Sequence, residues 1–319
     1  MNKFITSEDF IFNTKVFQMI STQNENSNLI LNQSTKLMRN LEDTLSFYKD
    51  NSNIDKINKN AGKNFVQVSQ ITFDIVEKSK YYSKLTDGLF DITIAPLVKM
   101  WGVNSDTPHV LTDDNISKTL SLVNYEDIIL NKNKQEIMLA KENQQIDLGG
   151  IAKGYIADLV IDFYKKNNVE SALVNIGGNI KVLGRKSPSD LWKVGIYKPE
   201  KHSSDILCSL SVEDMSVVTS GTYERAFMKN NKLYHHILNP RTGYPAKTDI
   251  ASITIVNESS LLCDGLSTPL LIIGAYDASQ FMKQNNIEGI IITNDNKIIV
   301  SKNLLSKFSL HYDYEVLCF

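Results

Sequence analysis

Apolar positions that recur every three to four residues mark the predicted helices of this chain. Ile151, Tyr155, Leu159 and Phe163 recur every four residues and give one apolar face over about three turns. This spacing predicts a helix that ends near residue 167. Further helices are predicted at 28–47, at about 69–85 and at about 259–273, and residues 112–115 can cap another short helix.

Apolar runs bounded by small or polar turns mark the predicted strands. A strand-like stretch at 10–20 is interrupted at Asn13-Thr14, and residues 103–143 are predicted to form a local insertion of short helix and hairpin. Other strands are predicted at 144–148, 171–176, 193–197, 206–212, 217–221 and 250–256, with a hairpin around 229–232. Repeats, low-complexity tracts and Pro- or Ser-rich linkers are absent from the sequence. A single domain over residues 1–319 is therefore predicted, in which 275–319 is closing structure.

Composition narrows the class of protein. The 319 residues are 42% hydrophobic and 22% charged, which is typical of a globular protein. A net charge of −2 lacks the excess of basic residues that is typical of nucleic-acid-binding proteins. Three widely spaced cysteines make neither a disulfide framework nor a metal cluster. The N-terminal residues show no signal-peptide pattern and no lipid-accepting cysteine, and no run is long enough to span a membrane, so a cytoplasmic location is predicted.

The junction between a strand-like run and a helix holds the first candidate site. Gly149 and Gly150 let the backbone approach a ligand closely, and the helix start leaves N–H groups without intrahelical partners. With Lys153 in the first turn, these groups favour an anion such as phosphate. The alternative is a strand–turn–helix connection in which the glycines serve packing alone.

A second candidate site lies on the predicted helix at 259–273. Asp264, Ser267 and Thr268 share one face at spacings of three and four. Carboxylate and hydroxyl oxygens one turn apart can share a hard cation such as Mg²⁺, which completes its shell with water and substrate phosphate. A helix-capping acid is the alternative, because such spacings are common by chance.

Three further residues have two interpretations each. His236 precedes the stiff turn at 239–243 and could act as a general base, although most single histidines lie on the surface or are satisfied in the core. Arg241 could clamp an anion or brace its own loop, and His235 is interpreted as a bystander. Asp91 interrupts the apolar run at 89–98, so it is structural or a ligand group. Motifs of Rossmann, P-loop and α/β-hydrolase enzymes are absent.

Six segments, in order, resemble the ApbE family of FAD:protein FMN transferases. The likeness runs from about residue 12 to about residue 274. The segments are Thr86-Asp-Gly-Leu-Phe-Asp-Ile-Thr93, Asp147-Leu-Gly-Gly-Ile-Ala-Lys-Gly-Tyr155, Val174-Asn-Ile-Gly-Gly-Asn179, Thr219-Ser-Gly221, His236-Ile-Leu-Asn-Pro-Arg-Thr-Gly243 and Asp264-x-x-x-Thr268.

The resemblance implies a compact α+β fold, ApbE-like and T-fold-like, with mixed and antiparallel sheets flanked by helices. It implies an enzyme that binds FAD with Mg²⁺, cleaves the pyrophosphate and attaches FMN through a phosphoester to a Thr or Ser of a target flavoprotein, releasing AMP. This sequence departs from the family's usual motifs at Phe12-Asn13-Thr14, Ser52-Asn53, Thr222 and Asn239. None of these residues is a predicted metal ligand.

Site residues follow from the resemblance by position. The predicted metal ligands are the Gly150 carbonyl and the side chains of Asp264, Ser267 and Thr268. The predicted FAD contacts are Tyr48, Leu89, Phe90, Asp91, Asp147, Lys153, Ser220, Gly221 and His236, and the predicted catalytic residues are His236 and Asp264. Two alternatives remain: a Mg²⁺-dependent FAD pyrophosphatase that releases FMN and AMP, and a non-catalytic FAD-binding carrier.

Overall fold

The computed structural model describes residues 4–23, 26–102, 109–201, 203–229 and 232–319. Contacts divide the chain into two compact units. Unit 1 comprises residues 1–42, 153–221 and 248–319, and unit 2 comprises residues 43–152 and 222–247. Each unit is built from segments that are distant in the sequence, which is why no linker marks a boundary. The single domain stays a prediction.

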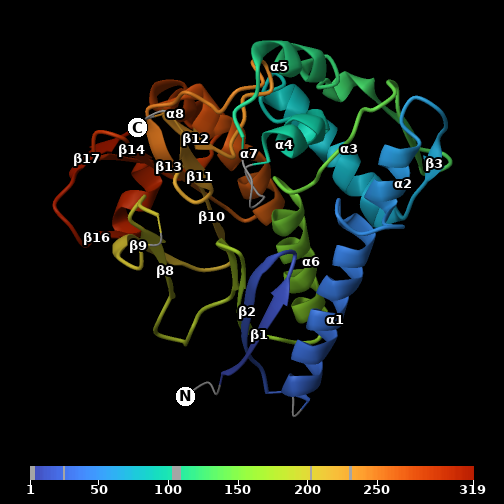
Figure 1. The fold of residues 1–319 in the computed structure, drawn as a ribbon. Helices are drawn as coiled ribbons and strands as arrows, with labels where there is room; N and C mark the ends of the chain where they lie inside the picture. The colour runs from blue at the N-terminus through green and yellow to red at the C-terminus, as the bar shows by residue number, and fades with distance from the viewer. Residues whose placement is uncertain (1–3, 24–25, 103–108, 202, 230–231) are drawn as a thin grey trace. The chain divides into compact units, whose positions relative to one another are not determined.

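A large, mostly antiparallel sheet forms the centre of unit 1 (Figure 1). Its described strands lie in the order β1 (Ile5–Ile11), β2 (Thr14–Ser21), β6 (Ser171–Ile176), β7 (Asn179–Leu183), β10 (Ser216–Gly221), β13 (Ile250–Asn257), β14 (Glu288–Thr293), β15 (Lys297–Val300) and β17 (Glu315–Cys318). Every neighbouring pair is antiparallel except β15 and β17, which are parallel.

Tight turns fix the register at one end of this sheet. Phe12 and Asn13 join β1 to β2 with φ values of 58° and 55°, and Gly177 and Gly178 join β6 to β7 with φ values of 56° and 90°. Left-handed turn residues match the twist of paired strands, so both connections are short hairpins. The predicted break at Asn13-Thr14 is therefore a hairpin turn one residue earlier, and the first strand begins at Ile5 rather than at residue 10.

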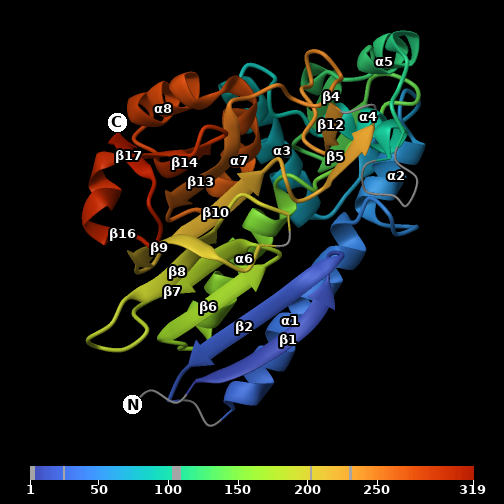
Figure 2. The same cartoon turned by 60° about the vertical axis from the view of Figure 1, so that its left-hand side comes forward.

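Helices α1 (Ser27–Leu45), α6 (Ala152–Lys166), α7 (Ser260–Ile273) and α8 (Ala275–Gln284) belong wholly or mainly to unit 1. Helix α7 packs on β10 and β13, and α8 packs on β14. Figures 1 and 2 show α1 and α6 side by side along β1, β2 and β6. The Tyr164 hydroxyl and the Ser34 hydroxyl both donate to Gln18 Oε1 at 2.6 Å, so this buried polar group joins α6, α1 and β2.

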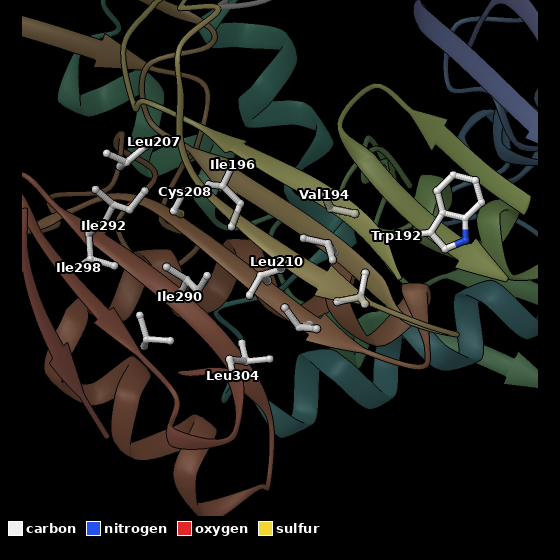
Figure 3. Packing of buried hydrophobic residues seen from close by; sticks show 14 of the residues in the cluster. Trp192, Val194, Ile196, Leu207, Cys208, Leu210, Ile290, Ile292, Ile298 and Leu304 are labelled. Carbon is white, nitrogen blue, oxygen red and sulfur yellow. The ribbon is translucent and has the colours of Figure 1, made fainter. Parts of the chain in front are cut away.

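A small sheet covers the large sheet of unit 1 through an apolar cluster. It consists of β8 (Trp192–Tyr197), β9 (Ile206–Val212) and β16 (Phe308–Leu310), beside the 3₁₀ helix η3 (Lys302–Lys307). Figure 3 shows Val194 and Leu210 of the small sheet packed with Ile290 of β14. Alternating buried positions along these strands form a continuous core between the two sheets.

Unit 2 is smaller and mainly helical. It contains α2 (Asn53–Lys59), α3 (Gln70–Leu85), η1 (Ile92–Ile94), α4 (Ala95–Trp101), α5 (Asp113–Leu120), η2 (Tyr125–Asp127), the sheet of β3 (Val66–Gln67), β5 (Glu136–Leu139) and β4 (Ile128–Asn131), and the hairpin of β11 (Ala226–Lys229) and β12 (Lys232–His235). Trp101 is fully buried in an apolar cluster with Leu97, Ile116 and Leu238. This cluster packs the chain around residues 234–244 onto α4 and α5.

The predicted fold class is confirmed, since helices flank antiparallel and mixed sheets. The four predicted helices are present as α1, α3, α6 and α7. Thr112 caps α5 as predicted, and Ser69 caps α3. The insertion at 103–143 contains α5 and the β4–β5 hairpin, while residues 103–108 lie outside the described residues. Within the described part of the chain, no helix has the length and apolarity that a membrane span requires.

The predicted strand at 144–148 is wrong. These residues belong to none of the strands found in the described part of the chain. The Asn58 side chain donates to the Ile146 carbonyl and accepts from the Ile146 N–H, and the Asp147 N–H donates to the Ile92 carbonyl at 2.9 Å. A side-chain amide thus replaces the neighbouring strand that the apolar pattern suggested.

Candidate functional site

In unit 1, residues of α7 and β10 bring several side-chain oxygen atoms together. Asp264 is 6% exposed, and the Ser267 hydroxyl on the same helix is fully buried. Ser267 Oγ donates to the Asp264 carbonyl at 3.2 Å and lies 2.8 Å from Ser220 Oγ, which is 3.4 Å from Thr268 Oγ1. The hydroxyls of Ser220, Ser267 and Thr268 therefore form one group, which Ser267 joins to the backbone carbonyl of Asp264, and these four residues are called the oxygen cluster.

Helix α6 holds the Asp264 carboxylate from the other side. The Gly154 N–H, at the start of α6, donates to Asp264 Oδ2 at 2.8 Å. A Cβ at Gly154 would lie 2.3 Å from the Ser260 carbonyl oxygen and 2.6 Å from Asp264 Cβ, so only glycine allows this approach. Sequence reasoning missed this role of Gly154, although the residue stands inside the glycine-rich segment that it singled out.

The donor set of unit 1 fits a hard divalent cation. One carboxylate and neighbouring hydroxyls are the oxygen ligands that Mg²⁺ prefers, and that ion keeps several positions for water and substrate phosphate. The described residues contain no group of three or more His, Cys, Asp or Glu side chains that could hold a metal.

Two other predicted residues of unit 1 lie near the ends of these elements. Gly221 is buried at the end of β10, directly after Ser220. Lys153 is half-buried in the first turn of α6, next to Gly154. Both are therefore adjacent in the chain to residues of the oxygen cluster.

The glycine junction belongs to unit 2. Asp147 is half-buried, and its Oδ1 accepts the Gly149 N–H at 3.1 Å. Leu148 is buried, and its carbonyl accepts the N–H groups of Ile151 and Ala152, which starts the helical turn. Gly149 and Gly150 are both exposed, as a backbone surface for a ligand requires.

Leu89, Phe90 and Asp91 follow the C-terminal end of α3 and are almost fully buried. Phe90 lies under the glycine junction, since its Cε2 atom is 3.5 Å from where a Cβ of Gly150 would stand. The two predicted contact segments of unit 2 are therefore neighbours.

The carboxylate of Asp91 is fully engaged by the protein. Oδ1 accepts from the Thr93 N–H at 2.8 Å and the Thr93 hydroxyl at 2.6 Å, and Oδ2 accepts from the Tyr125 N–H at 2.9 Å. Burial raises the pKa of the Asp91 carboxyl to about 6, while these hydrogen bonds oppose the rise. The geometry supports the structural interpretation of Asp91, and its FAD contact stays a prediction.

His236 stands at the start of a closed turn in unit 2. The backbone N–H of His236 donates to the Arg225 carbonyl at 3.0 Å, and the ring atom Nδ1 lies 3.3 Å from the same carbonyl oxygen. A carbonyl can only accept, so Nδ1 carries the proton and Nε2 the lone pair of the neutral ring. The half-buried His236 ring is thus oriented by the carbonyl of Arg225, which lies 11 residues earlier in the chain.

His235 points elsewhere and fits the bystander interpretation. It is 6% exposed, and its Nε2 lies 3.0 Å from the Ala246 carbonyl. Burial lowers the pKa of the His235 ring, so the neutral form is favoured there.

The turn after His236 is braced at three points. The Asn239 carbonyl accepts the Gly243 N–H at 2.8 Å, and Asn239 Oδ1 accepts the Arg241 N–H at 2.9 Å. Trp101 Nε1 donates to the Gly243 carbonyl at 2.8 Å. Arg241 donates to the carbonyl and the carboxylate of Asp87, in the turn after α3, which is a contact that neither of its two interpretations specified.

A depression on unit 2 adjoins this turn. It has a volume of about 390 Å³. Its walls are Gly88, Asp91, Leu120, Val123, Asn124, Tyr125, Pro240 and Arg241. Of the predicted site residues only Asp91 lines it, and the segment at 120–125 carried no sequence signal beyond a local insertion. Tyr48, the remaining predicted contact in unit 2, is 67% exposed and meets Phe47 edge-on.

The comparisons with known proteins address the family of this chain. The model of the ApbE family matches residues 11–291. The chain belongs to the ApbE family. It is 35% identical over 284 residues to the FAD:protein FMN transferase of Klebsiella pneumoniae (strain 342), covering 88% of each chain. It is 30% identical over 286 residues to that of Treponema pallidum (strain Nichols), covering 85% of this chain and 79% of the other.

Solved structures of ApbE proteins share the fold. The ApbE protein of Thermotoga maritima superposes with a TM-score of 0.89 at 28% identity, over 96% of this chain and 99% of that one. The flavin transferase ApbE of Vibrio cholerae gives a TM-score of 0.86 at 24% identity, over 96% of this chain and 100% of that one, which shows the fold alone.

Proposed function

We propose that this ApbE-family protein transfers FMN from FAD to a Thr or Ser hydroxyl of a target flavoprotein in a Mg²⁺-dependent reaction. The observation that carries the proposal is the nearly buried Asp264 carboxylate, which the Gly154 N–H holds on the helix that also carries Ser267 and Thr268. The hydroxyls of Ser267 and Thr268 lie 2.8 and 3.4 Å from Ser220 Oγ. It stands in a chain whose relatives are named FAD:protein FMN transferase.

The proposed reaction exchanges one phosphorus–oxygen bond for another. The acceptor hydroxyl oxygen bonds to the phosphorus atom on the FMN side of FAD, and the bond from that phosphorus to the bridging oxygen breaks. AMP leaves with the bridging oxygen and the electron pair. The hydroxyl proton passes to a base and then to solvent or AMP, so no oxidant or reductant is needed.

Asp264, Ser267, Thr268 and the Gly150 carbonyl are the proposed holders of Mg²⁺. When bound, the cation supplies charge neutralisation for the pyrophosphate and the leaving phosphate. The protein's own part is to keep the Asp264 carboxylate in one orientation, which the Gly154 N–H does at 2.8 Å. The near-complete burial of Asp264 limits competition from bulk water.

His236 is the proposed base for the acceptor hydroxyl. The Arg225 carbonyl holds the proton on Nδ1, so Nε2 is the atom that accepts the hydroxyl proton. A free Thr hydroxyl is a weak nucleophile, and removal of its proton as the new bond forms lowers the barrier.

The remaining predicted residues are proposed to bind FAD. Lys153, in the first turn of α6, and the exposed backbone of Gly150 favour the pyrophosphate, because a cation at the start of a helix attracts an anion. The proposed contacts to the rest of the cofactor are Tyr48, Leu89, Phe90, Asp91, Asp147, Ser220 and Gly221.

Covalent flavin on a denatured acceptor tests this proposal. The protein is incubated with FAD, MgCl₂ and a flavoprotein domain that carries a candidate Thr, and the denatured acceptor is examined for flavin fluorescence. Fluorescent acceptor with MgCl₂ and none with EDTA is the expected result. Free FMN and AMP beside an unlabelled acceptor that a known family member does label would favour the pyrophosphatase. Uncleaved FAD in both buffers would favour the carrier.

The base assignment has its own variant. His236→Ala is expected to lower the rate of acceptor labelling about a hundred-fold or more, because a positioned base contributes that much. His311→Ala, at an exposed histidine of unit 1, is the matched control and should keep the wild-type rate. Full labelling by His236→Ala would remove His236 from the mechanism.

A further inference from the structure

Arg241 links two motif-bearing segments of unit 2. It lies in the turn that follows His236, and its guanidinium donates to the Asp87 carbonyl at 2.8 Å and to the Asp87 carboxylate. Asp87 lies in the turn that leads from α3 into Leu89, Phe90 and Asp91. One side chain thus joins the His236 turn to the segment proposed to contact FAD.

The Asp87 end of this link is a helix C-terminus. The Asp87 N–H donates to the Lys84 carbonyl and the Gly88 N–H to the Ser83 carbonyl, and Asp87 and Gly88 have φ values of 50° and 76°. Carbonyl groups at a helix C-terminus carry partial negative charge, so they favour a cation. The positive charge of Arg241 is therefore stabilised by the carboxylate of Asp87 and by the negative end of the helix dipole of α3.

The turn is tied directly to the contact segment. Thr86 Oγ1 donates to the Tyr82 carbonyl at 2.8 Å and accepts the Phe90 N–H at 3.0 Å. The Thr86 carbonyl accepts the Leu89 N–H at 3.0 Å. A shift of the Asp87 turn would therefore move Leu89 and Phe90 with it.

The Arg241 end of the link is equally constrained. The Arg241 N–H is held by Asn239 Oδ1, and the Gly243 carbonyl is held by the indole of Trp101, which is fully buried. A Cβ at Gly243 would lie 2.6 Å from Ile116, so the turn is packed closely onto α5. His236 and Arg241 are five residues apart in this rigid stretch.

We propose that Arg241 is a positioning residue, which fixes the His236 turn against the Asp87 turn so that His236 stays in register with bound FAD. This inference rests on the proposed function. The same guanidinium would otherwise be a direct clamp on an anionic part of FAD. Its donation to both the carbonyl and the carboxylate of Asp87 favours positioning.

The pair contributes little to global stability. The side chains of Arg241 and Asp87 are 52% and 95% exposed, and exposed pairs are screened by water and salt. An effect of Arg241 on turnover would therefore appear without a matching loss of folded protein.

Steady-state transfer kinetics with Arg241→Met test the proposal. Methionine keeps much of the apolar stem and removes every guanidinium contact. The turnover number for acceptor labelling should fall about ten-fold, since small displacements of a catalytic group are costly. The FAD dissociation constant, measured by flavin fluorescence, should stay within about two-fold, and the unfolding midpoint should not move. Arg241→Lys should recover part of the turnover.

A double-mutant cycle identifies the partner. Asp87→Ala removes the carboxylate and leaves the carbonyl, so a smaller loss of turnover is expected. Arg241→Met with Asp87→Ala together should be no slower than Arg241→Met alone. Lys132→Met is the matched control, because Lys132 forms an exposed ion pair with Glu77 of α3, and wild-type turnover is expected.

Different results overturn the two proposals separately. A wild-type protein that transfers no FMN, where a known family member labels the same acceptor, contradicts the proposed function. If the wild type is active, positioning is contradicted by an unchanged turnover in Arg241→Met. It is also contradicted by an FAD dissociation constant that rises in step with the loss, which would make Arg241 a direct anion clamp.

Discussion

The orientation of the Asp264 carboxylate depends on Gly154, a residue that has no side chain. Asp264 is nearly buried, its carboxylate accepts the Gly154 N–H, and its backbone carbonyl accepts the Ser267 hydroxyl. A buried carboxylate is stable only when hydrogen bonds or a cation balance it. A cation bound at Asp264 would add to the hydrogen bond that the Gly154 N–H supplies.

Asp264→Asn tests this at the residue scale. The amide keeps the size of the side chain and removes its charge, so Mg²⁺-dependent transfer should fall about a hundred-fold or more. Isothermal titration of MgCl₂ with FAD present should show weakened metal binding in the same variant. Asp277→Asn makes the same change at an exposed carboxylate of α8 and should behave as the wild type. Equal Mg²⁺ affinity in both variants would contradict the assignment.

At the scale of elements, the contact between α6 and α7 determines the geometry of the oxygen cluster. It is close because Gly154 places backbone against the first turn of α7, where a Cβ would meet the Ser260 carbonyl. The contact also carries the hydrogen bond to Asp264. Helix separation and carboxylate orientation are therefore one structural feature.

Gly154→Ala is expected to affect stability and Mg²⁺ dependence together. The added methyl meets backbone that cannot move aside, so the free energy of unfolding should fall by about 1–3 kcal/mol. The Mg²⁺ concentration for half-maximal transfer should rise, because Asp264 is displaced. Denaturant unfolding and a MgCl₂ titration measure these effects. Asp162→Ala, at an exposed site of α6, should change neither. Wild-type values for Gly154→Ala would refute the close packing.

Asp91 joins η1 to η2 and makes this connection sensitive to pH. Burial raises the folded-state pKa of Asp91 to about 6 from its ordinary value near 3.8. Below pH 4 the Asp91 carboxyl is protonated in both the folded and the unfolded state, so it does not lower the free energy of unfolding. Above pH 6 it is ionised in both states, and the folded state carries the cost of a buried charge.

The contribution of Asp91 to the free energy of unfolding should therefore fall by up to about 3 kcal/mol as the pH rises from 4 to 6. Asp91→Asn does not titrate. In denaturant titrations, the unfolding free energy of the wild type minus that of this variant should therefore decrease as the pH rises from 4 to 6. A difference that is constant with pH would contradict the raised pKa.

The elements could be predicted from the sequence where local pattern and packing agree. Helices α1, α3, α6 and α7 follow from their apolar spacing, because α1, α3 and α6 each bury an apolar face and α7 is buried along most of its length. The stretch at 144–148 could not be predicted, because Asn58 takes the place of a paired strand and lies 88 residues from Ile146. Arg241 had two open interpretations, since its partner Asp87 is 154 residues away.

At the scale of the whole molecule, the chain alternates between two units and distributes the predicted site residues over both. Unit 1 carries Lys153, Ser220, Gly221, Asp264, Ser267 and Thr268, and unit 2 carries Tyr48, Leu89, Phe90, Asp91, Asp147, Gly150 and His236. The sequence could order these motifs through their resemblance to a family. It could not assign them to units, because both units are assembled from separate segments.

The intact mass of an acceptor domain tests the central claim most directly. The purified protein, FAD and MgCl₂ are mixed with a flavoprotein domain that has one candidate Thr, and with the same domain in which that Thr is changed to Val. The account predicts that only the Thr-containing domain gains the mass of one FMN less one water, with one AMP formed for each acceptor modified. FAD cleavage to free FMN and AMP, with an unmodified domain that a known family member does modify, would contradict it.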